Sequence, residues 1–315
     1  MIVEKKQTDS DNFKLNWHFF AAAREAFMYI LRHEQKGKKI LLPAYIGYSS
    51  KEGSGVFDPV SATGAEYDFY SLDRSLNIDV RNVADRIHAN KGNILLLIHY
   101  FGFRDPHLDA IKKMARSSGM VIIEDFAHAF YTFWLHPLVD FDYAIFSTHK
   151  LFPVETGGAL LSSRPIERQD SAIFNYCAYD IPGIIRRRMS NYRFILKGLD
   201  HFSKKHDIEI LRRRCDGCVP QTFPLLLRDG QLRDRLYFAL NDAGFGAVSL
   251  YHQLITQIPD TYEAERDISS RILNLPVHQD ADEGRLRGML QQIRSIVRDE
   301  GETAFGGGRW NANHE

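Results

Sequence analysis

The sequence predicts an α/β protein: a large domain built on a mainly parallel, mixed sheet, followed by a smaller C-terminal α+β domain. Short apolar runs without alternation recur through the first 200 residues, and stretches of helical length separate them. Near residue 200 the pattern becomes charged and mixed. Unalternating runs are typical of strands buried on both faces, and strand–helix alternation indicates a parallel sheet. We therefore expect domains over residues 1–200 and 201–300, and a flexible tail over 301–315.

The first half of the chain supplies most of the predicted elements. Apolar residues at helical spacing predict a helix over residues 17–33, and a second helix is expected over 105–119 between a Pro-containing start and a glycine end. Buried strands are expected at 38–43, 93–100, 119–125, 142–147 and 157–163. In the second half, we expect a strand over 220–230 and amphipathic helices over 231–245 and 284–299.

Composition excludes several classes of protein. The 315 residues are 44% hydrophobic and 25% charged, which is enough apolar material for a sizeable core and excludes wholesale disorder. Lys and Arg number 40, as do Asp and Glu, so charge gives no argument for nucleic acid or a membrane as partner. The N-terminal 16 residues are polar, and no apolar run approaches the roughly 18 residues of a membrane span. We expect a cytoplasmic protein.

The three cysteines do not indicate a disulfide framework or a metal centre. Cys215 and Cys218 form one C-x-x-C, and Cys177 stands apart. A structural zinc usually takes a second pair of ligands at matching spacing, and none follows in the sequence. We expect ordinary thiols in a reducing compartment and no metal.

Polar side chains follow three of the predicted strands. His99 ends one apolar run, Asp125 ends the next and precedes His128, and Ser147 precedes Lys150 after a third. Ligands gather at the carboxyl ends of parallel strands. Taken singly, such an aspartate is often a helix cap, the lysine a solvated loop residue and the histidine a structural side chain. Together, at this spacing, they suggest one cofactor site.

These segments resemble the DegT/DnrJ/StrS family of nucleotide-sugar aminotransferases, which are fold-type I enzymes dependent on pyridoxal 5′-phosphate. The matching segments are HYFG at 99–102, VIIEDFAHAF at 121–130, FSTHK at 146–150 and ETGGALL at 155–161. Further similarity is seen in AAAREAF at 21–27, SNYR at 190–193 and ILNLPVHQ at 272–279, so the resemblance extends from residue 17 to about 298.

The resemblance implies a role for each of these polar residues. Lys150 would form the Schiff base (the internal aldimine) with the cofactor aldehyde, since this requires a primary amine. Asp125 would pair with the pyridine nitrogen and keep it protonated. His128 would lie beside the ring, and Ser147 would bind the phosphate.

Further residues are implied around the cofactor. Backbone N–H groups of Ala22, Ala23 and Arg24 would bind the phosphate at a helix N-terminus. Either Tyr45 or Tyr48, just after Pro43, would stack on the ring. Asn191 would reach the phosphate region of a neighbouring subunit's site. The arginines beside it, which would meet the diphosphate of a nucleotide-linked substrate, are Arg186, Arg187, Arg188 and Arg193.

The implied function is a homodimeric transferase of polysaccharide or antibiotic sugar biosynthesis. It would move an amino group from a donor, with glutamate expected, to a keto sugar that is expected to be nucleotide-linked. The chain departs from the family in the three-residue spacing from Ser147 to Lys150, in His149 directly before the lysine, and in Arg24, where many members have a small residue. Three alternatives stay open: a non-catalytic or regulatory protein of this fold, a sugar dehydratase that uses the same cofactor, and an unrelated α/β protein. The dehydratases resemble the chain less, because they replace the lysine.

Overall fold

The computed structural model describes residues 16–306, apart from residue 35, residues 138–139 and residues 168–174. Residues 1–15, which make up nearly all of the polar N-terminal segment noted above, lie outside the described residues. Residues 307–315 of the expected tail also lie outside them.

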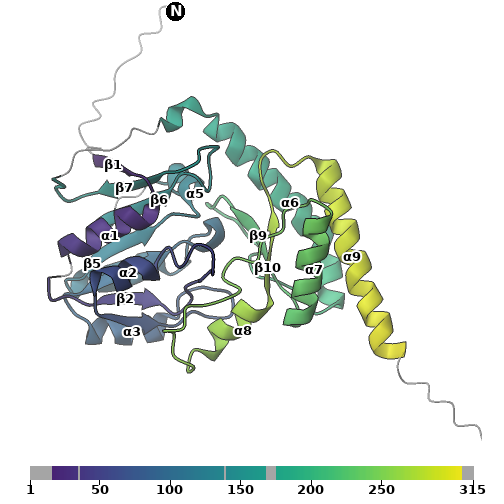
Figure 1. Ribbon diagram of the computed structural model, residues 1–315, viewed down its shortest axis with the longest axis horizontal. Coiled ribbons are helices and arrows are strands. Elements are labelled where there is room, and N and C mark those ends of the chain that lie inside the picture. Colours follow the sequence, from purple (N-terminus) through teal and green to yellow (C-terminus); the bar gives the residue numbers. More distant parts are fainter. Residues whose placement is uncertain (1–15, 35, 138–139, 168–174, 307–315) are drawn as a thin grey trace, which may run out of the picture.

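A seven-stranded sheet forms the centre of the first half, in the order β1-β7-β6-β5-β4-β2-β3 (Figure 1). Its strands are β1 (Asn16–Phe20), β2 (Ile40–Pro43), β3 (Tyr67–Tyr70), β4 (Ile94–Ile98), β5 (Val121–Asp125), β6 (Tyr143–Ser147) and β7 (Gly158–Ser162). The strands from β2 to β6 pair in parallel, and β7 pairs antiparallel with both β6 and β1. The predicted fold class, α/β with a mainly parallel mixed sheet, is confirmed.

The start of the chain differs from its predicted form. We predicted a helix over residues 17–33, but residues 16–20 form strand β1, and the helix α1 spans Ala23–Glu34. The sequence NWHFF is rich in aromatic residues that favour strands. Its backbone pairs along the whole of β7, from Asn16 opposite Ser162 to Phe20 opposite Gly158. The helical spacing of the apolar residues therefore corresponds to a helix only from Ala23 onward.

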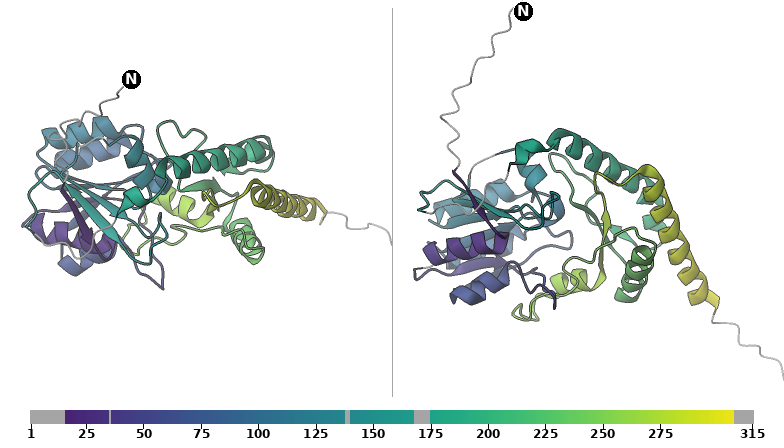
Figure 2. Two further views of the ribbon diagram at one scale, coloured as in Figure 1. Left: turned by 90° about the horizontal axis from the view of Figure 1, so that it is seen from above. Right: turned by 45° about the horizontal axis from the view of Figure 1, so that its top comes forward.

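Helices cover both faces of this sheet, as the left view of Figure 2 shows. On one face, Leu96 and Ile123 pack with residues of α1 and α2 (Phe57–Thr63). On the other face, Leu95 and Ile122 pack with residues of α3 (Val80–Ala89), α4 (Leu108–Ser117) and α5 (Phe130–Leu135). Burial on both sides explains why these strands show no alternation of polar and apolar residues.

The second half is built on a three-stranded antiparallel sheet, in the order β10-β9-β8. The strands are β8 (Glu209–Ile210), β9 (Thr222–Leu226) and β10 (Ile272–Pro276), and the helices are α6 (Ile181–Lys205), α7 (Gly230–Asp242), α8 (Glu263–Arg271) and α9 (Glu283–Gly306). Helix α6 leads from the large sheet to this part, and α9 lies farthest from the large sheet (Figure 1). The helix α9 continues to Gly306, beyond residue 300, where the tail was expected to begin.

The two halves share one hydrophobic core. Tyr192 of α6 is fully buried and packs against Phe103 after β4 and against Phe223 of β9, with ring centroids 5.8 and 4.6 Å apart. Gly102, at φ +92°, lets the backbone at Val219 approach so closely that a Cβ atom would meet the Val219 carbonyl oxygen at 2.3 Å. The boundary predicted near residue 200 falls inside α6, and the division into domains stays a prediction.

Within the described residues, every helix is too short or too polar to cross a lipid bilayer.

Candidate active site

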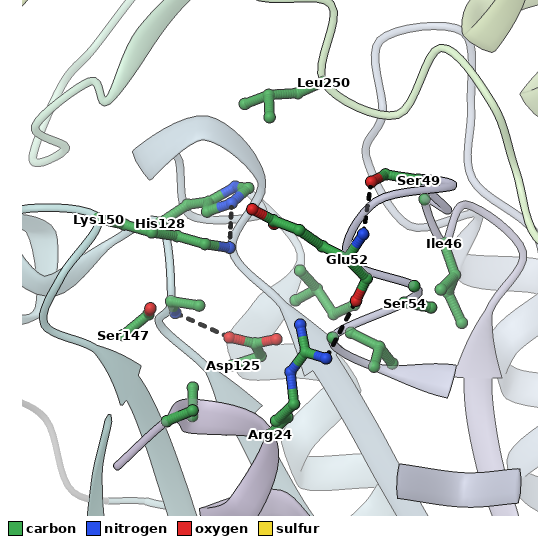
Figure 3. Close-up of a pocket in the computed structure, with 18 of the residues that line it drawn as sticks. Arg24, Ile46, Ser49, Glu52, Ser54, Asp125, His128, Ser147, Lys150 and Leu250 are labelled. Carbon is green, nitrogen blue, oxygen red and sulfur yellow. Dashed lines mark hydrogen bonds between the residues drawn. The ribbon is translucent and has the colours of Figure 1, made fainter. Parts of the chain in front are cut away.

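A cavity of about 210 Å³ lies at the carboxyl ends of the parallel strands (Figure 3). Its walls come from the ends of β4, β5 and β6, from the start of α1, from the loop after β2, and from a loop of the second half that carries Leu250 and Tyr251. Because the crossover connections of a parallel sheet bring all these strand ends to one edge, side chains far apart in the sequence meet there. Eight of the predicted site residues line the cavity: Ala22, Ala23, Arg24, Tyr48, Asp125, His128, Ser147 and Lys150.

Asp125 is the last residue of β5 and is buried. Its Oδ1 atom accepts a hydrogen bond of 2.7 Å from the Ala127 N–H, which fixes the carboxylate at the end of the strand (Figure 3). Burial raises the pKa of Asp125, while the Ala127 N–H and the charges of Lys150 and His99 oppose this effect. Keeping this buried carboxylate charged therefore costs folding free energy, and a cationic ligand in the cavity would offset that cost.

Lys150 and His128 lie side by side in the cavity. The Nζ atom of Lys150 is 3.2 Å from Nε2 of His128 (Figure 3). Burial lowers the pKa of His128 well below its ordinary value, and the charge of Lys150 adds to this effect. The imidazole is therefore neutral near pH 7, and its Nε2 accepts from Nζ whenever Lys150 is an ammonium group.

The Lys150 amine is open to the cavity at a turn after β6. Desolvation by the surrounding protein lowers its pKa, whereas the carboxylates of Asp125 and Glu52 act in the opposite direction. A lysine with a lowered pKa is more often a neutral amine, the form that attacks a carbonyl carbon.

Ser147 ends β6 and is buried beside the start of α1. Its Oγ lies 3.3 Å from Nδ1 of His149, which also lies 3.3 Å from the Gly157 carbonyl oxygen. The unusual histidine before the lysine thus connects the Ser147 end of β6 to the loop that leads into β7.

The first turn of α1 points its N–H groups toward this cavity. Ala22 precedes the helix, and its carbonyl accepts from the N–H groups of Glu25 and Ala26. The N–H groups of a helix's first turn have no partner inside the helix, and the helix dipole favours an anion there. Gly158 of β7 lies against this turn, since a Cβ atom would meet the Ala23 nitrogen at 2.3 Å. The second glycine of the Gly–Gly pair therefore permits the helix to start here.

The two tyrosines predicted as alternatives for ring stacking occupy different places. Tyr48 is 45% exposed and lines the cavity. Tyr45 is fully buried and contacts the rings of Tyr100 and Tyr251, with centroids 5.5 and 5.3 Å away. Of the two, Tyr48 has access to a ligand, and the stacking role itself stays a prediction.

Asn191 does not line the cavity. Its amide donates to the His278 carbonyl at 2.7 Å and to the Ala281 carbonyl at 3.4 Å, so within one chain it joins α6 to the segment before α9. Its predicted role in a neighbouring subunit stays a prediction. Arg188 is different from the other arginines of α6, because it is buried over the Tyr131 ring and donates to Gln279. It is committed to the fold, and the prediction that it meets a diphosphate is wrong.

A buried network of ionisable side chains lies next to Asp125, on the opposite face of β5. Glu124 accepts from His99 at 2.8 Å and from Lys112 of α4 at 2.6 Å, and all three side chains are at most 2% exposed. Glu124 and Asp125 point to opposite faces of β5, because successive side chains of a strand alternate. The network therefore fixes the ends of β4 and β5, and His99 has a structural place outside the cavity.

The C-x-x-C lies away from the cavity. Cys215 and Cys218 are free thiols, and Sγ of Cys218 accepts from the Arg104 N–H at 3.3 Å. Among the described residues, His, Cys, Asp and Glu form no group of three that would suit a metal ion.

The sequence reasoning missed part of the cavity lining, including Glu52, Leu250 and Tyr251. Glu52 belongs to a polar Ser- and Gly-rich loop after β2, and the rule that ligands bind at strand ends would have pointed to it. Leu250 and Tyr251 come from the second half of the chain. Nothing in their local sequence connects them to the sheet edge, since only the tertiary fold brings them there.

Comparison with known proteins agrees with this geometry. Residues 50–182 match the model of the DegT/DnrJ/EryC1/StrS aminotransferase family. The aminotransferase TlmJ from Streptoalloteichus hindustanus is similar in structure, with 18% identity, a TM-score of 0.69, and 90% of this chain and 86% of that chain covered. No curated protein matches the chain in sequence.

Two further solved structures are similar. DesV from S. venezuelae, in complex with a ketimine intermediate, shares 17% identity and a TM-score of 0.70, over 89% of this chain and 84% of that one. Spr1654 from Streptococcus pneumoniae, described as a sugar aminotransferase in its PMP form, shares 14% identity and a TM-score of 0.70, over 92% and 88% of the chains.

The family match confirms the predicted resemblance and the predicted enzyme class, an aminotransferase dependent on pyridoxal phosphate. The residues of the cavity also fit this cofactor. A carboxylate, a primary amine and a hydroxyl surround a space that ends at a helix N-terminus. The buried Nδ1 atom of His128 has no hydrogen-bond partner among the described residues, as expected where a polar ligand binds.

Proposed function

We propose that this protein transfers an amino group from glutamate to a keto sugar that is linked to a nucleotide. The observation that carries the proposal is the placement of Lys150, 3.2 Å from His128, in one cavity with Asp125 and the start of α1. The sugar aminotransferase description of Spr1654 supports the class of acceptor.

The cavity residues would hold the cofactor at three points. Ser147 and the N–H groups of Ala22, Ala23 and Arg24 would bind its phosphate, because they offer donors at the positive end of the α1 dipole. Asp125 would pair with the ring nitrogen through its charge. Once bound, the cofactor supplies an aldehyde for the lysine and a ring that withdraws electrons from the substrate carbon.

Lys150 would then serve a second purpose as the group that moves a proton. Its Nζ atom, with a lowered pKa, can take a proton from the substrate carbon and return it elsewhere. His128 stays neutral and accepts a hydrogen bond from Nζ, which orients the amine between transfers.

Three further features belong to the proposal. The protein would be a cytoplasmic homodimer, in which Asn191 reaches the partner's cofactor phosphate. Arg186, Arg187 and Arg193 are exposed on α6, unlike the buried Arg188, and would meet the diphosphate of the acceptor. The product would be an amino sugar for a polysaccharide or an antibiotic.

Removal of the Lys150 amine tests the proposal. Lys150→Ala should prevent covalent attachment of the cofactor on borohydride reduction and abolish bleaching of the yellow holoprotein by L-glutamate. Lys51→Ala is the matched control, because Lys51 is an exposed lysine near the cavity that does not line it. Mass spectrometry that maps the reduced adduct to another lysine would contradict the assignment.

A further inference from the structure

Glu52 is a charged residue of the cavity to which the proposed mechanism gives no task. It lies in the loop after β2, in the sequence SSKEGSG at 49–55. Its side chain is exposed to the cavity, and it lines the same space as Lys150 and His128. Figure 3 shows its carboxylate directed across the cavity toward these two residues.

Hydrogen bonds hold the backbone of this loop in place. Ser49 and Gly53 exchange backbone hydrogen bonds of 3.1 and 2.8 Å, and the Glu52 N–H donates to Ser49 Oγ at 3.1 Å. The Arg24 guanidinium of α1 donates to the Glu52 carbonyl at 3.0 Å. These bonds fix the backbone from which the Glu52 side chain extends, and none of them uses the carboxylate.

The carboxylate itself has no hydrogen bond or ion pair with the described residues, although its charge acts on Lys150 and partly opposes the lowering of the pKa of that amine. An exposed carboxylate is solvated by water, and a ligand that displaces this water must replace it with a hydrogen-bond donor or a cation. Hydroxyl groups are such donors, and a keto sugar carries them next to its carbonyl carbon. A carboxylate next to the carbonyl, as in a 2-oxo acid, would be repelled instead.

We infer that Glu52 determines substrate specificity: its carboxylate accepts hydrogen bonds from acceptor hydroxyl groups near the reacting carbon and disfavours anionic groups at that place. This inference rests on the proposed aminotransferase function and adds a residue that selects the acceptor. The same repulsion acts on the carboxylates of the amino donor, so selectivity for the acceptor is gained at the expense of donor affinity.

Three small probes separate these effects. The protein is loaded with pyridoxamine phosphate, and the return of yellow colour is followed after addition of D-glyceraldehyde, propanal or pyruvate. These carry, next to the carbonyl, a hydroxyl group, no polar group and a carboxylate, respectively. In Glu52→Gln, the preference for glyceraldehyde over propanal should fall about tenfold. The rate with pyruvate relative to propanal should rise at least about fivefold, and bleaching by L-glutamate should become faster.

Glu155→Gln is the matched control, because it removes the same charge from an exposed residue close to Lys150 in sequence that does not line the cavity. It should keep the wild-type ratios among the probes. Ratios in Glu52→Gln equal to those of the wild type would overturn the inference and leave the proposed function intact. If the wild type responds neither to L-glutamate nor to any probe, the proposed function itself fails.

A second measurement needs no turnover. In the cofactor-free protein, the rate at which an amine-reactive reagent labels Lys150 is followed against pH by mass spectrometry. Removing the Glu52 charge should shift the midpoint to lower pH, since that charge raises the pKa of Lys150. An unchanged midpoint in a folded Glu52→Gln protein would show that the carboxylate does not face the amine and would overturn the inference.

Discussion

Asp125 combines two demands that conflict at the scale of a single residue. The proposed mechanism needs a charged Asp125 carboxylate beside the ring nitrogen, whereas burial raises the pKa of Asp125 and so opposes that charge. In the unfolded chain the carboxylate is solvated and ionises at its ordinary pKa. Between this pKa and the raised folded value, the native state binds more protons, so stability falls as pH rises through that window. Asp125 therefore makes the cofactor-free protein less stable at neutral pH.

We predict opposite effects of Asp125→Asn on stability and activity. The cofactor-free variant should melt at a higher temperature than the wild type at pH 7, and the difference should vanish below the ordinary pKa of an aspartate. Transamination should fall on the order of 10²-fold or more, because the neutral amide no longer holds the ring nitrogen protonated. Calorimetry at several pH values and single-turnover bleaching measure the two effects. Near wild-type turnover would show that Asp125 is only a structural end of β5.

Residues next to strand ends were predictable from the sequence to different degrees. Asp125 and Ser147 end apolar runs and Lys150 comes three residues after Ser147, so the strand pattern alone placed them at one edge. The choice between Tyr45 and Tyr48 was not predictable, because a shift of a few residues in a loop decides whether a ring packs inward or lines the cavity. Glu52 was missed for a related reason, because a polar loop that contains a glutamate looks like an ordinary solvated turn in the sequence.

At the scale of elements, the contact between β7 and the start of α1 decides whether an anion can bind. The Gly158 backbone passes so close to Ala22 and Ala23 that any side chain would displace the first turn of the helix. This contact also explains the wrong boundary in the predicted helix over 17–33. The helix must begin where it meets Gly158, and the residues before it pair with β7 as a strand, which is a tertiary constraint without a local signal.

Gly158→Ala should therefore weaken cofactor binding. The added Cβ moves the N–H groups of Ala23 and Arg24 away from the phosphate, and we expect a rise in the dissociation constant of pyridoxal phosphate of about tenfold. Fluorescence titration of the folded, cofactor-free variant measures it. Gly288→Ala serves as the control, since a Cβ on this residue of α9 makes only ordinary contacts, the nearest at 3.5 Å. Equal affinities in the two variants would remove this helix start from the phosphate site.

At the scale of the whole molecule, the second half of the chain returns to pack against the large sheet at β3 and at the loop after β2. Glu265 of α8 accepts from the Leu72 N–H at 2.7 Å, and the Tyr262 hydroxyl donates to the Phe69 carbonyl at 2.9 Å. The Ile255 N–H donates to the Ile46 carbonyl in the same region at 3.0 Å. These contacts hold the loop with Leu250 and Tyr251 over the cavity. The bonded residues lie about 200 positions apart in the sequence. Local sequence patterns could therefore predict helices and strands in each half of the chain, but not the contribution of Leu250 and Tyr251 to the cavity.

Assembly gives the last prediction, because Asn191 has two possible roles that a mixture of inactive chains can separate. If its amide serves the partner's cofactor phosphate, light scattering should show a homodimer. Exchange of subunits between Lys150→Ala and Asn191→Ala chains should then restore part of the activity, since one of the two hybrid sites keeps both groups. If Asn191 only joins α6 to the His278 and Ala281 carbonyls, its loss lowers the melting temperature without complementation. Absence of rescue in mixed dimers verified by mass spectrometry would therefore leave Asn191 as a residue of the fold, and a fully active monomer would place the whole site within one chain.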